Sequence, residues 1–91
     1  MTRVALLGAT GSIGKAALDL ARSHPDRIRL RSLAARANDA ALIRAAHEFG
    51  VPRIALVDPE AARRARASFR GEVLEGEGAL VQLAEEDGVD V

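Results

Sequence analysis

The stretch Gly8-Ala9-Thr10-Gly11-Ser12-Ile13-Gly14 decides the fold of this 91-residue chain. It follows residues 4–7, a short apolar run of the kind that forms a strand buried on both faces. It leads into residues 12–23, in which apolar side chains recur at helical spacing. The order of buried strand, glycine-rich turn and helix predicts the first unit of a parallel α/β sheet.

Each glycine of this G-x-x-G-x-x-G pattern has a physical role. Gly8 allows a tight turn off the strand, and Gly11 lets the backbone approach a pyrophosphate without a Cβ in the way. Gly14 lets the helix lie close against the sheet. Unpaired N–H groups at the helix start and the helix dipole favour an anion there, and Thr10 and Ser12 add hydroxyl donors. The pattern therefore predicts a dinucleotide site formed by this loop.

Two other interpretations of the loop are weaker. Three glycines could simply shape a strand-to-helix turn, although the strand–loop–helix context favours binding. The loop is not a Walker A motif, because Lys15 follows Gly14 but no Ser or Thr follows Lys15 to hold a magnesium ion. Lys15 is therefore expected to be a solvated helix residue.

The remainder of the chain repeats the alternation of strand and helix. Further strands are predicted at residues 27–33, 53–57, 72–74 and 89–91. Further helices are predicted from Asn38 or Asp39 to residue 49, from Asp58 to about residue 71, and over residues 77–87. The order predicts a Rossmann-like, doubly wound parallel sheet in three α/β/α layers, and an incomplete one. Residues 1–91 are expected to be the N-terminal portion of such a domain.

The patterns also predict how two elements face the sheet. Within residues 27–33, Ile28 and Leu30 alternate with arginines, which is typical of a strand with one wet face near a sheet edge. The first helix is expected to turn one apolar stripe toward the sheet, formed by Ile13, Ala17, Leu20 and Ala21.

The end of the second predicted strand indicates which dinucleotide binds. In NAD-binding folds, an acid at this place bonds the ribose 2′-hydroxyl. Here the chain has Arg36-Ala37-Asn38, and the first acid is Asp39. The planar guanidinium of Arg36 suits a 2′-phosphate, which favours NADP over NAD. The alternative is a surface arginine in a chain whose basic residues are nearly all arginine.

Composition excludes several other classes of function. Thirteen basic and thirteen acidic residues give a net charge of zero, which provides no electrostatic attraction for nucleic acid or an anionic membrane. The absence of cysteine excludes disulfides and thiolate metal sites. No apolar run fits a membrane span or a signal peptide, so a cytoplasmic location is expected. His24 and His47 lack metal-pair spacing, and no catalytic constellation is evident.

Several segments together resemble the N-terminal part of the 1-deoxy-D-xylulose-5-phosphate reductoisomerase family. The resemblance covers nearly the whole chain and is more specific than the glycine loop alone. It rests on the loop itself, Leu18-Asp19, His24-Pro25-Asp26, Leu33-Ala34-Ala35, Asn38, Pro52-Arg53, and Glu72-Val73-Leu74 with Gly76.

The resemblance implies an NADPH-dependent, homodimeric enzyme of non-mevalonate isoprenoid biosynthesis. The family rearranges and reduces 1-deoxy-D-xylulose 5-phosphate to 2-C-methyl-D-erythritol 4-phosphate, with magnesium or manganese holding the substrate oxygens. By this resemblance, Asn38 lies at the adenosine end of NADPH, and the phosphates lie against Thr10, Gly11, Ser12 and Ile13.

The chain departs from the family pattern in one place and lacks some of its sites. The family usually has Gly-Lys or Gly-Ser before the asparagine, where this chain has Arg36-Ala37, so the adenosine-phosphate contact must differ. The family's metal carboxylates and substrate-phosphate site lie beyond residue 91. No catalytic or metal-binding residue is therefore predicted within this chain.

Similar loops occur in other classes. Semialdehyde-dehydrogenase-like proteins have G-A-T-G-x-V-G, and extended short-chain dehydrogenases have a related pattern. A dinucleotide-binding regulatory module without chemistry of its own is a further alternative. The His24-Pro25-Asp26 turn and the Leu33-Ala34-Ala35 segment followed by Asn38 favour the reductoisomerase.

Overall fold

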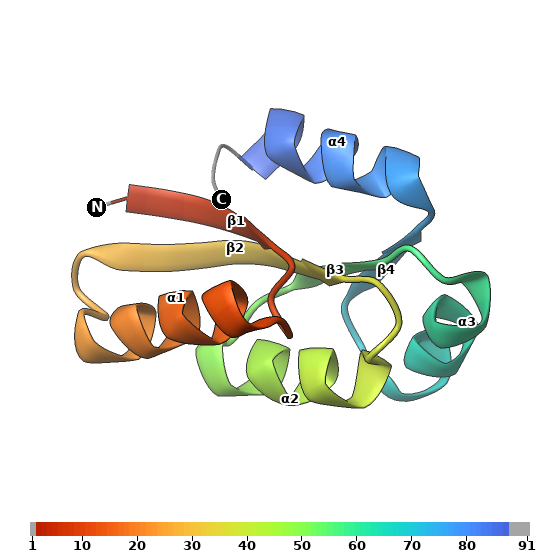
Figure 1. Cartoon of the computed structure of the whole chain (residues 1–91), viewed down its shortest axis with the longest axis horizontal. Coiled ribbons are helices and arrows are strands. Elements are labelled where there is room, and N and C mark those ends of the chain that lie inside the picture. Colours follow the sequence, from red (N-terminus) through yellow and green to blue (C-terminus); the bar gives the residue numbers. More distant parts are fainter. Residues whose placement is uncertain (1, 88–91) are drawn as a thin grey trace.

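The computed structural model describes residues 2–87, which alternate regularly between strand and helix (Figure 1). The elements are β1 (Thr2–Leu7), α1 (Ser12–Ser23), β2 (Ile28–Ala35), α2 (Asp39–Phe49), β3 (Arg53–Leu56), α3 (Pro59–Ser68), β4 (Glu72–Glu75) and α4 (Glu77–Asp87). The predicted order of elements is confirmed. The strand predicted at residues 89–91 lies outside the described residues.

The strands form one parallel sheet in the order β1-β2-β3-β4, with helices on both faces. In Figure 1, α1, α2 and α3 lie on one side of the sheet and α4 lies on the other. Two buried clusters match these layers. The larger joins α1–α3 to the sheet, and the smaller packs Ala79 and Leu83 of α4 on Ala5, Ala34 and Ala55. The three-layer α/β/α architecture is therefore confirmed.

The predicted position of β2 near a sheet edge is wrong. β2 lies between β1 and β3, and residues 32–35 are buried on both faces. Only the first half of the strand alternates, and there the register skips Arg31, because Val4 pairs with Leu30 and Ala5 with Ser32. Such a bulge lets a central strand carry an arginine just before its buried half begins.

The predicted apolar stripe of α1 is right for Ala21, which is buried, and for Ala17, which packs against the core, but wrong for Ile13 and Leu20. The buried residues of this helix are Gly14, Leu18 and Ala21, whereas Ile13 is 76% exposed and Leu20 is 54% exposed. Gly14 faces the backbone of the preceding turn, and this contact fixes the rotation of the helix about its axis. Leu18 and Ala21 then point to the sheet because they lie four and seven residues further on.

The predicted caps of α2 and α3 are confirmed. The side-chain oxygen of Asn38 accepts a hydrogen bond from the Ala41 amide at 3.2 Å and begins α2. α2 ends at Gly50, whose φ of 65° is left-handed. Asp58 accepts from the Ala61 amide at 3.0 Å and begins α3, with proline in the first helical turn. These contacts satisfy backbone groups that a helix cannot pair internally.

We expect Asp58→Ala to lower the free energy of unfolding by about 1 kcal/mol, because it leaves the amides at the start of α3 without their acceptor. Asp58→Asn keeps an acceptor at the same place and should lose less than half as much. Urea denaturation of both variants measures the difference. Equal losses in the two variants would contradict a capping role.

Candidate functional site

The two segments predicted to bind a dinucleotide lie on the same side of the molecule, beyond the carboxyl ends of the parallel strands. The glycine loop follows β1, and residues 36–38 follow β2, its parallel neighbour. A hydrogen bond of 2.8 Å from the Ala9 amide to the Ala34 carbonyl joins the loop to the end of β2. In doubly wound sheets, ligands bind outside the carboxyl ends of the strands, which is where these segments meet.

The glycine loop is a tight turn on which α1 rests directly. Gly8 has a φ of 74°, and its carbonyl accepts from the Gly11 amide at 3.1 Å. A Cβ on Gly14 would lie 2.1 Å from the Gly8 oxygen and 2.7 Å from the Ala9 Cα, so no larger residue fits. A Cβ on Gly11 would meet only the Gly8 oxygen, at an ordinary 3.6 Å. The chain's own packing therefore requires glycine at position 14 and not at position 11.

The start of α1 is open, unlike the starts of α2 and α3. Its N-cap is Gly11, and no side chain accepts a hydrogen bond from the first amides of the helix. Ser12 and Ile13 are exposed, and Thr10 is partly exposed. Within residues 2–87, the hydroxyls of Thr10 and Ser12 have no hydrogen-bond partner. Amides, hydroxyls and the positive end of the helix dipole are together suited to an anion.

The second segment presents a free guanidinium beside a fixed backbone. Arg36, Ala37 and Asn38 are all exposed. The Arg36 carbonyl accepts from the Asp58 amide at 2.9 Å, which ties the loop to the start of α3. Within the described residues, the Arg36 side chain forms no ion pair. The Asn38 oxygen accepts the capping hydrogen bond of α2, and the Asn38 amide nitrogen donates to no partner among residues 2–87.

One contact at this edge has no signal in the sequence. Arg64 of α3 donates two hydrogen bonds to Asp39, from Nη2 at 3.0 Å and from Nε at 3.3 Å. These bonds hold the pKa of the Asp39 carboxyl below its usual range. The two residues lie in different helices, so no pattern within either helix relates them.

Comparison with known proteins identifies the family. The family model described as 1-deoxy-D-xylulose 5-phosphate reductoisomerase matches residues 4–91. The chain belongs to this family. It is 42% identical to the reductoisomerase of Cupriavidus metallidurans over an alignment of 95 positions, which covers 99% of this chain and 24% of the relative. It is 39% identical over 85 residues to that of Rhodopseudomonas palustris strain BisB18, covering 90% of this chain and 21% of the relative.

Solved reductoisomerase structures share the fold of this chain. The enzyme from Zymomonas mobilis in complex with NADPH matches with a TM-score of 0.87 and 33% identity, over 93% of this chain and 23% of that one. A reductoisomerase in complex with NADPH, fosmidomycin and magnesium matches with a TM-score of 0.86 and 30% identity, over 99% of this chain and 23% of that one. The chain thus spans about a quarter of the length of these relatives.

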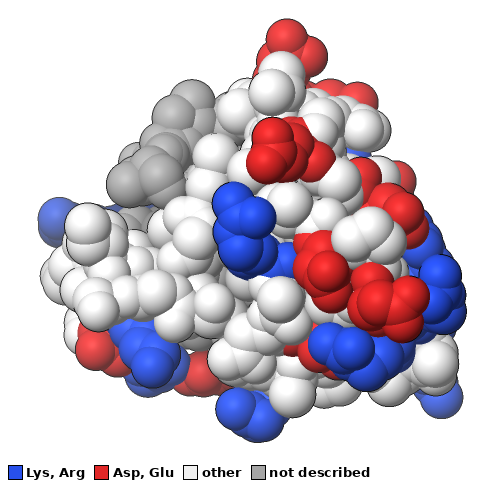
Figure 2. Space-filling model, turned by 45° about the vertical axis from the view of Figure 1, so that its right-hand side comes forward, with Lys and Arg blue, Asp and Glu red and all other residues white. Residues whose placement is uncertain are grey.

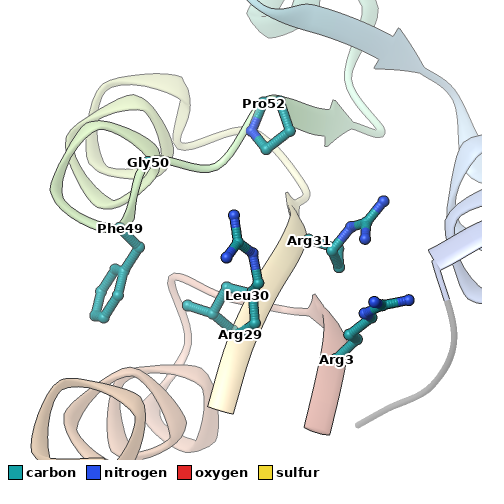
Figure 3. Close-up of a pocket in the computed structure, with 7 residues that line it drawn as sticks. All are labelled: Arg3, Arg29, Leu30, Arg31, Phe49, Gly50 and Pro52. Carbon is teal, nitrogen blue, oxygen red and sulfur yellow. The ribbon is translucent and has the colours of Figure 1, made fainter. Parts of the chain in front are cut away.

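A cleft lies at the opposite side of the sheet, near the amino-terminal ends of β1 and β2. It measures about 1030 Å³ and is lined by Arg3, Arg29, Leu30, Arg31, Phe49, Gly50 and Pro52. In Figure 3, the side chains of Arg3 and Arg31 extend to the same side of the sheet, and that of Arg29 extends past Leu30. These residues come from the amino-terminal halves of β1 and β2, from the last residue of α2 and from the turn before β3, so the cleft is separate from the glycine loop.

The histidines and most charged side chains of the chain are either exposed or held in structural contacts. His24 and His47 are exposed, and the His47 ring stacks on Phe69 with centroids 5.9 Å apart. Figure 2 shows acidic and basic side chains intermixed on one face, and ion pairs such as Arg66–Glu75 join them. Among residues 2–87, no three His, Asp or Glu side chains are grouped to hold a metal ion. No helix in that range is long and apolar enough to cross a membrane.

Proposed function

We propose that residues 1–91 form the N-terminal portion of an NADPH-binding domain. The enzyme to which they belong would convert 1-deoxy-D-xylulose 5-phosphate to 2-C-methyl-D-erythritol 4-phosphate in non-mevalonate isoprenoid biosynthesis. The observation that carries the proposal is the glycine loop, in which the Gly8 turn and the close contact at Gly14 set an uncapped helix start at the carboxyl edge of the sheet. Family membership over residues 4–91 supports the reaction.

We assign two roles within the proposed cofactor site. The loop would hold the pyrophosphate through its backbone amides and hydroxyls, using Gly8, Thr10, Gly11, Ser12, Ile13 and Gly14. The segment after β2 would hold the adenosine end, using Arg36, Ala37 and Asn38. NADPH supplies a hydride when bound, and the role of this chain is to fix the position of the cofactor at the sheet edge. The open side of Gly11 leaves room for backbone to approach a phosphate.

The rest of the proposal concerns parts outside this sequence. The substrate is a phosphorylated sugar, and a divalent metal, magnesium or manganese, would be held by residues beyond position 91. Reductoisomerase structures in complex with NADPH, fosmidomycin and magnesium support this. The glycine loop alone also fits semialdehyde dehydrogenases, extended short-chain dehydrogenases and regulatory modules, but the family match over residues 4–91 disfavours all three. A homodimeric state and a cytoplasmic location remain predictions, which sedimentation and cell fractionation would test.

We expect Arg36→Ala, in the full-length enzyme that contains these residues, to weaken NADPH binding and leave NADH binding nearly unchanged. The guanidinium can donate two charge-assisted hydrogen bonds to a 2′-phosphate, a contact worth roughly 1.5–3 kcal/mol, or about ten- to a hundredfold in affinity. Titration calorimetry with both cofactors at one fixed salt concentration measures the difference, since an exposed pair is screened by salt.

Arg44→Ala is the matched control, because Arg44 is an exposed arginine of α2 that lies six residues beyond Asn38. It removes the same charge and should change neither affinity by more than about twofold. Equal weakening of both cofactors by Arg36→Ala would show that Arg36 positions the loop without contacting the phosphate. No change in either would contradict the assignment of Arg36 to the site.

A further inference from the structure

An acidic residue lies next to the place proposed for the 2′-phosphate. Asp39 directly follows Asn38 and is three residues from Arg36, so their Cα atoms are at most about 11 Å apart. A carboxylate in this region repels a phosphate, and NAD-binding folds use an acid after the second strand to bond the free 2′-hydroxyl. Asp39 alone would therefore oppose the NADPH preference that Arg36 provides.

Asp39 is negatively charged at neutral pH, and it is paired with the positively charged Arg64. The hydrogen bonds from Arg64 lower the pKa of the Asp39 carboxyl, so the group stays ionised. The same bonds raise the pKa of Arg64, which therefore stays charged as well. The Asp39 side chain is 20% exposed, and that of Arg64 is 57% exposed.

The position of Arg64 is coupled to the loop that carries Arg36. Asp58 donates its backbone amide to the Arg36 carbonyl at 2.9 Å and caps α3 with its side chain. Arg64 lies six residues further along the same helix, on the side that meets the start of α2. The helix that carries Arg64 is therefore joined at its start to the loop that carries Arg36.

We propose that Arg64 is a specificity-determining residue, which favours NADPH over NADH by neutralising Asp39 so that a 2′-phosphate meets Arg36 without a competing negative charge. The inference rests on the proposed function and adds a residue that acts through Asp39, not by touching the cofactor. Its consequence is that removal of Arg64 exposes a charge that repels only the phosphorylated cofactor.

The test is a double-mutant cycle in the full-length enzyme. At low ionic strength, Arg64→Gln should raise the Kd for NADPH by about three- to tenfold, while the Kd for NADH changes by less than about twofold. The rise in the Kd for NADPH should disappear as the salt concentration approaches about 1 M, because salt screens the charge. Asp39→Asn in the Arg64→Gln background should restore the NADPH affinity to within about twofold of the wild type.

Arg63→Gln is the matched control. Arg63 is the residue next to Arg64 in α3 and pairs with Glu60 of its own helix. Its replacement removes the same positive charge and one exposed ion pair but leaves the contacts of Asp39 unchanged. It should leave both affinities within about twofold of the wild type. Melting temperatures of all variants, measured in parallel, verify that each one is folded.

The outcomes separate the inference from the proposed function. If the wild type does not bind NADPH, the proposed function is wrong. If the wild type prefers NADPH and Arg64→Gln keeps that preference, only the role of Arg64 is wrong. If Asp39→Asn fails to restore the binding lost in Arg64→Gln, or if Arg63→Gln weakens NADPH binding equally, neutralisation of Asp39 is not the mechanism and the inference is overturned.

Discussion

Gly14→Val is expected to destabilise the chain by about 3 kcal/mol, the upper range for an overpacked site. The first atom of the new side chain would lie 2.1 Å from the Gly8 carbonyl oxygen, which belongs to the backbone at the end of β1. α1 would have to move off the turn to relieve the overlap, and Leu18 and Ala21 would lose their contacts with the sheet. In a 91-residue chain, such a loss lowers the melting temperature by roughly 12–24 °C, which calorimetry can measure.

Gly11→Ala is the matched control for this prediction. The backbone of Gly11 is extended, with a φ of −82°, and its Cβ would meet only the Gly8 oxygen at 3.6 Å. The change should alter the free energy of unfolding by less than about 1 kcal/mol. It should nevertheless weaken NADPH binding, if this side of the loop faces the pyrophosphate as we propose. A Gly14→Val variant as stable as the wild type, or a Gly11→Ala variant as unstable as Gly14→Val, would contradict this division of roles.

The features that the sequence predicts well depend on local chemistry. Asn38, Gly50 and the Asp58-Pro59 pair set the ends of α2 and α3 through side-chain caps, a left-handed glycine and a proline near the helix start. Each signal acts within a few residues, so no tertiary contact is needed to read it. The meeting of the glycine loop with residues 36–38 is also predictable, because parallel neighbouring strands place their carboxyl ends at one edge.

The features that the sequence misses depend on contacts between distant segments. Hydrophobicity alone selected Ile13 and Leu20 for the buried face of α1, yet the contact between Gly14 and the Gly8 turn rotates both of them toward solvent. The sequence predicts that Gly14 lets the helix approach the sheet, but a glycine does not contribute to an apolar stripe, so the pattern does not show that Gly14 also sets the rotation of the helix. The arginines of β2 indicated an edge strand, because no local signal shows that a bulge at Arg31 lets the strand continue into the interior.

The pair of Asp39 and Arg64 illustrates the same limit at the candidate site. In the sequence, Asp39 is only a helix-start acid and Arg64 only one of several arginines on an outer face. The separation of 25 residues has no periodicity that relates them. Their contact exists because α2 and α3 pack side by side on the same face of the sheet. If Arg64 acts as we propose, cofactor preference depends on this packing of α2 against α3 as well as on Arg36 after β2.

The chain of residues 1–91, purified by itself, is expected to show no turnover with 1-deoxy-D-xylulose 5-phosphate, NADPH and magnesium. The reaction needs a bound hydride donor, a metal that holds the substrate oxygens, and a site for the substrate phosphate. The residues that we assign to the cofactor could supply the first of these. Among residues 2–87, no three metal-binding side chains are grouped to provide the second. Since enzymes accelerate reactions by about a millionfold or more, the loss relative to the full-length enzyme should be complete within detection.

The assay follows the absorbance of NADPH, with the full-length enzyme as the positive control and buffer without protein as the background. NADPH binding to the chain is measured in parallel by calorimetry, because a chain that binds the cofactor and still does not oxidise it separates binding from catalysis. If the chain neither binds nor reacts, the cofactor site requires residues beyond position 91 in addition to the glycine loop and residues 36–38. Turnover above the background by the chain alone would contradict the placement of the metal and substrate sites outside these residues, since hydride transfer would then have to proceed with the side chains present here.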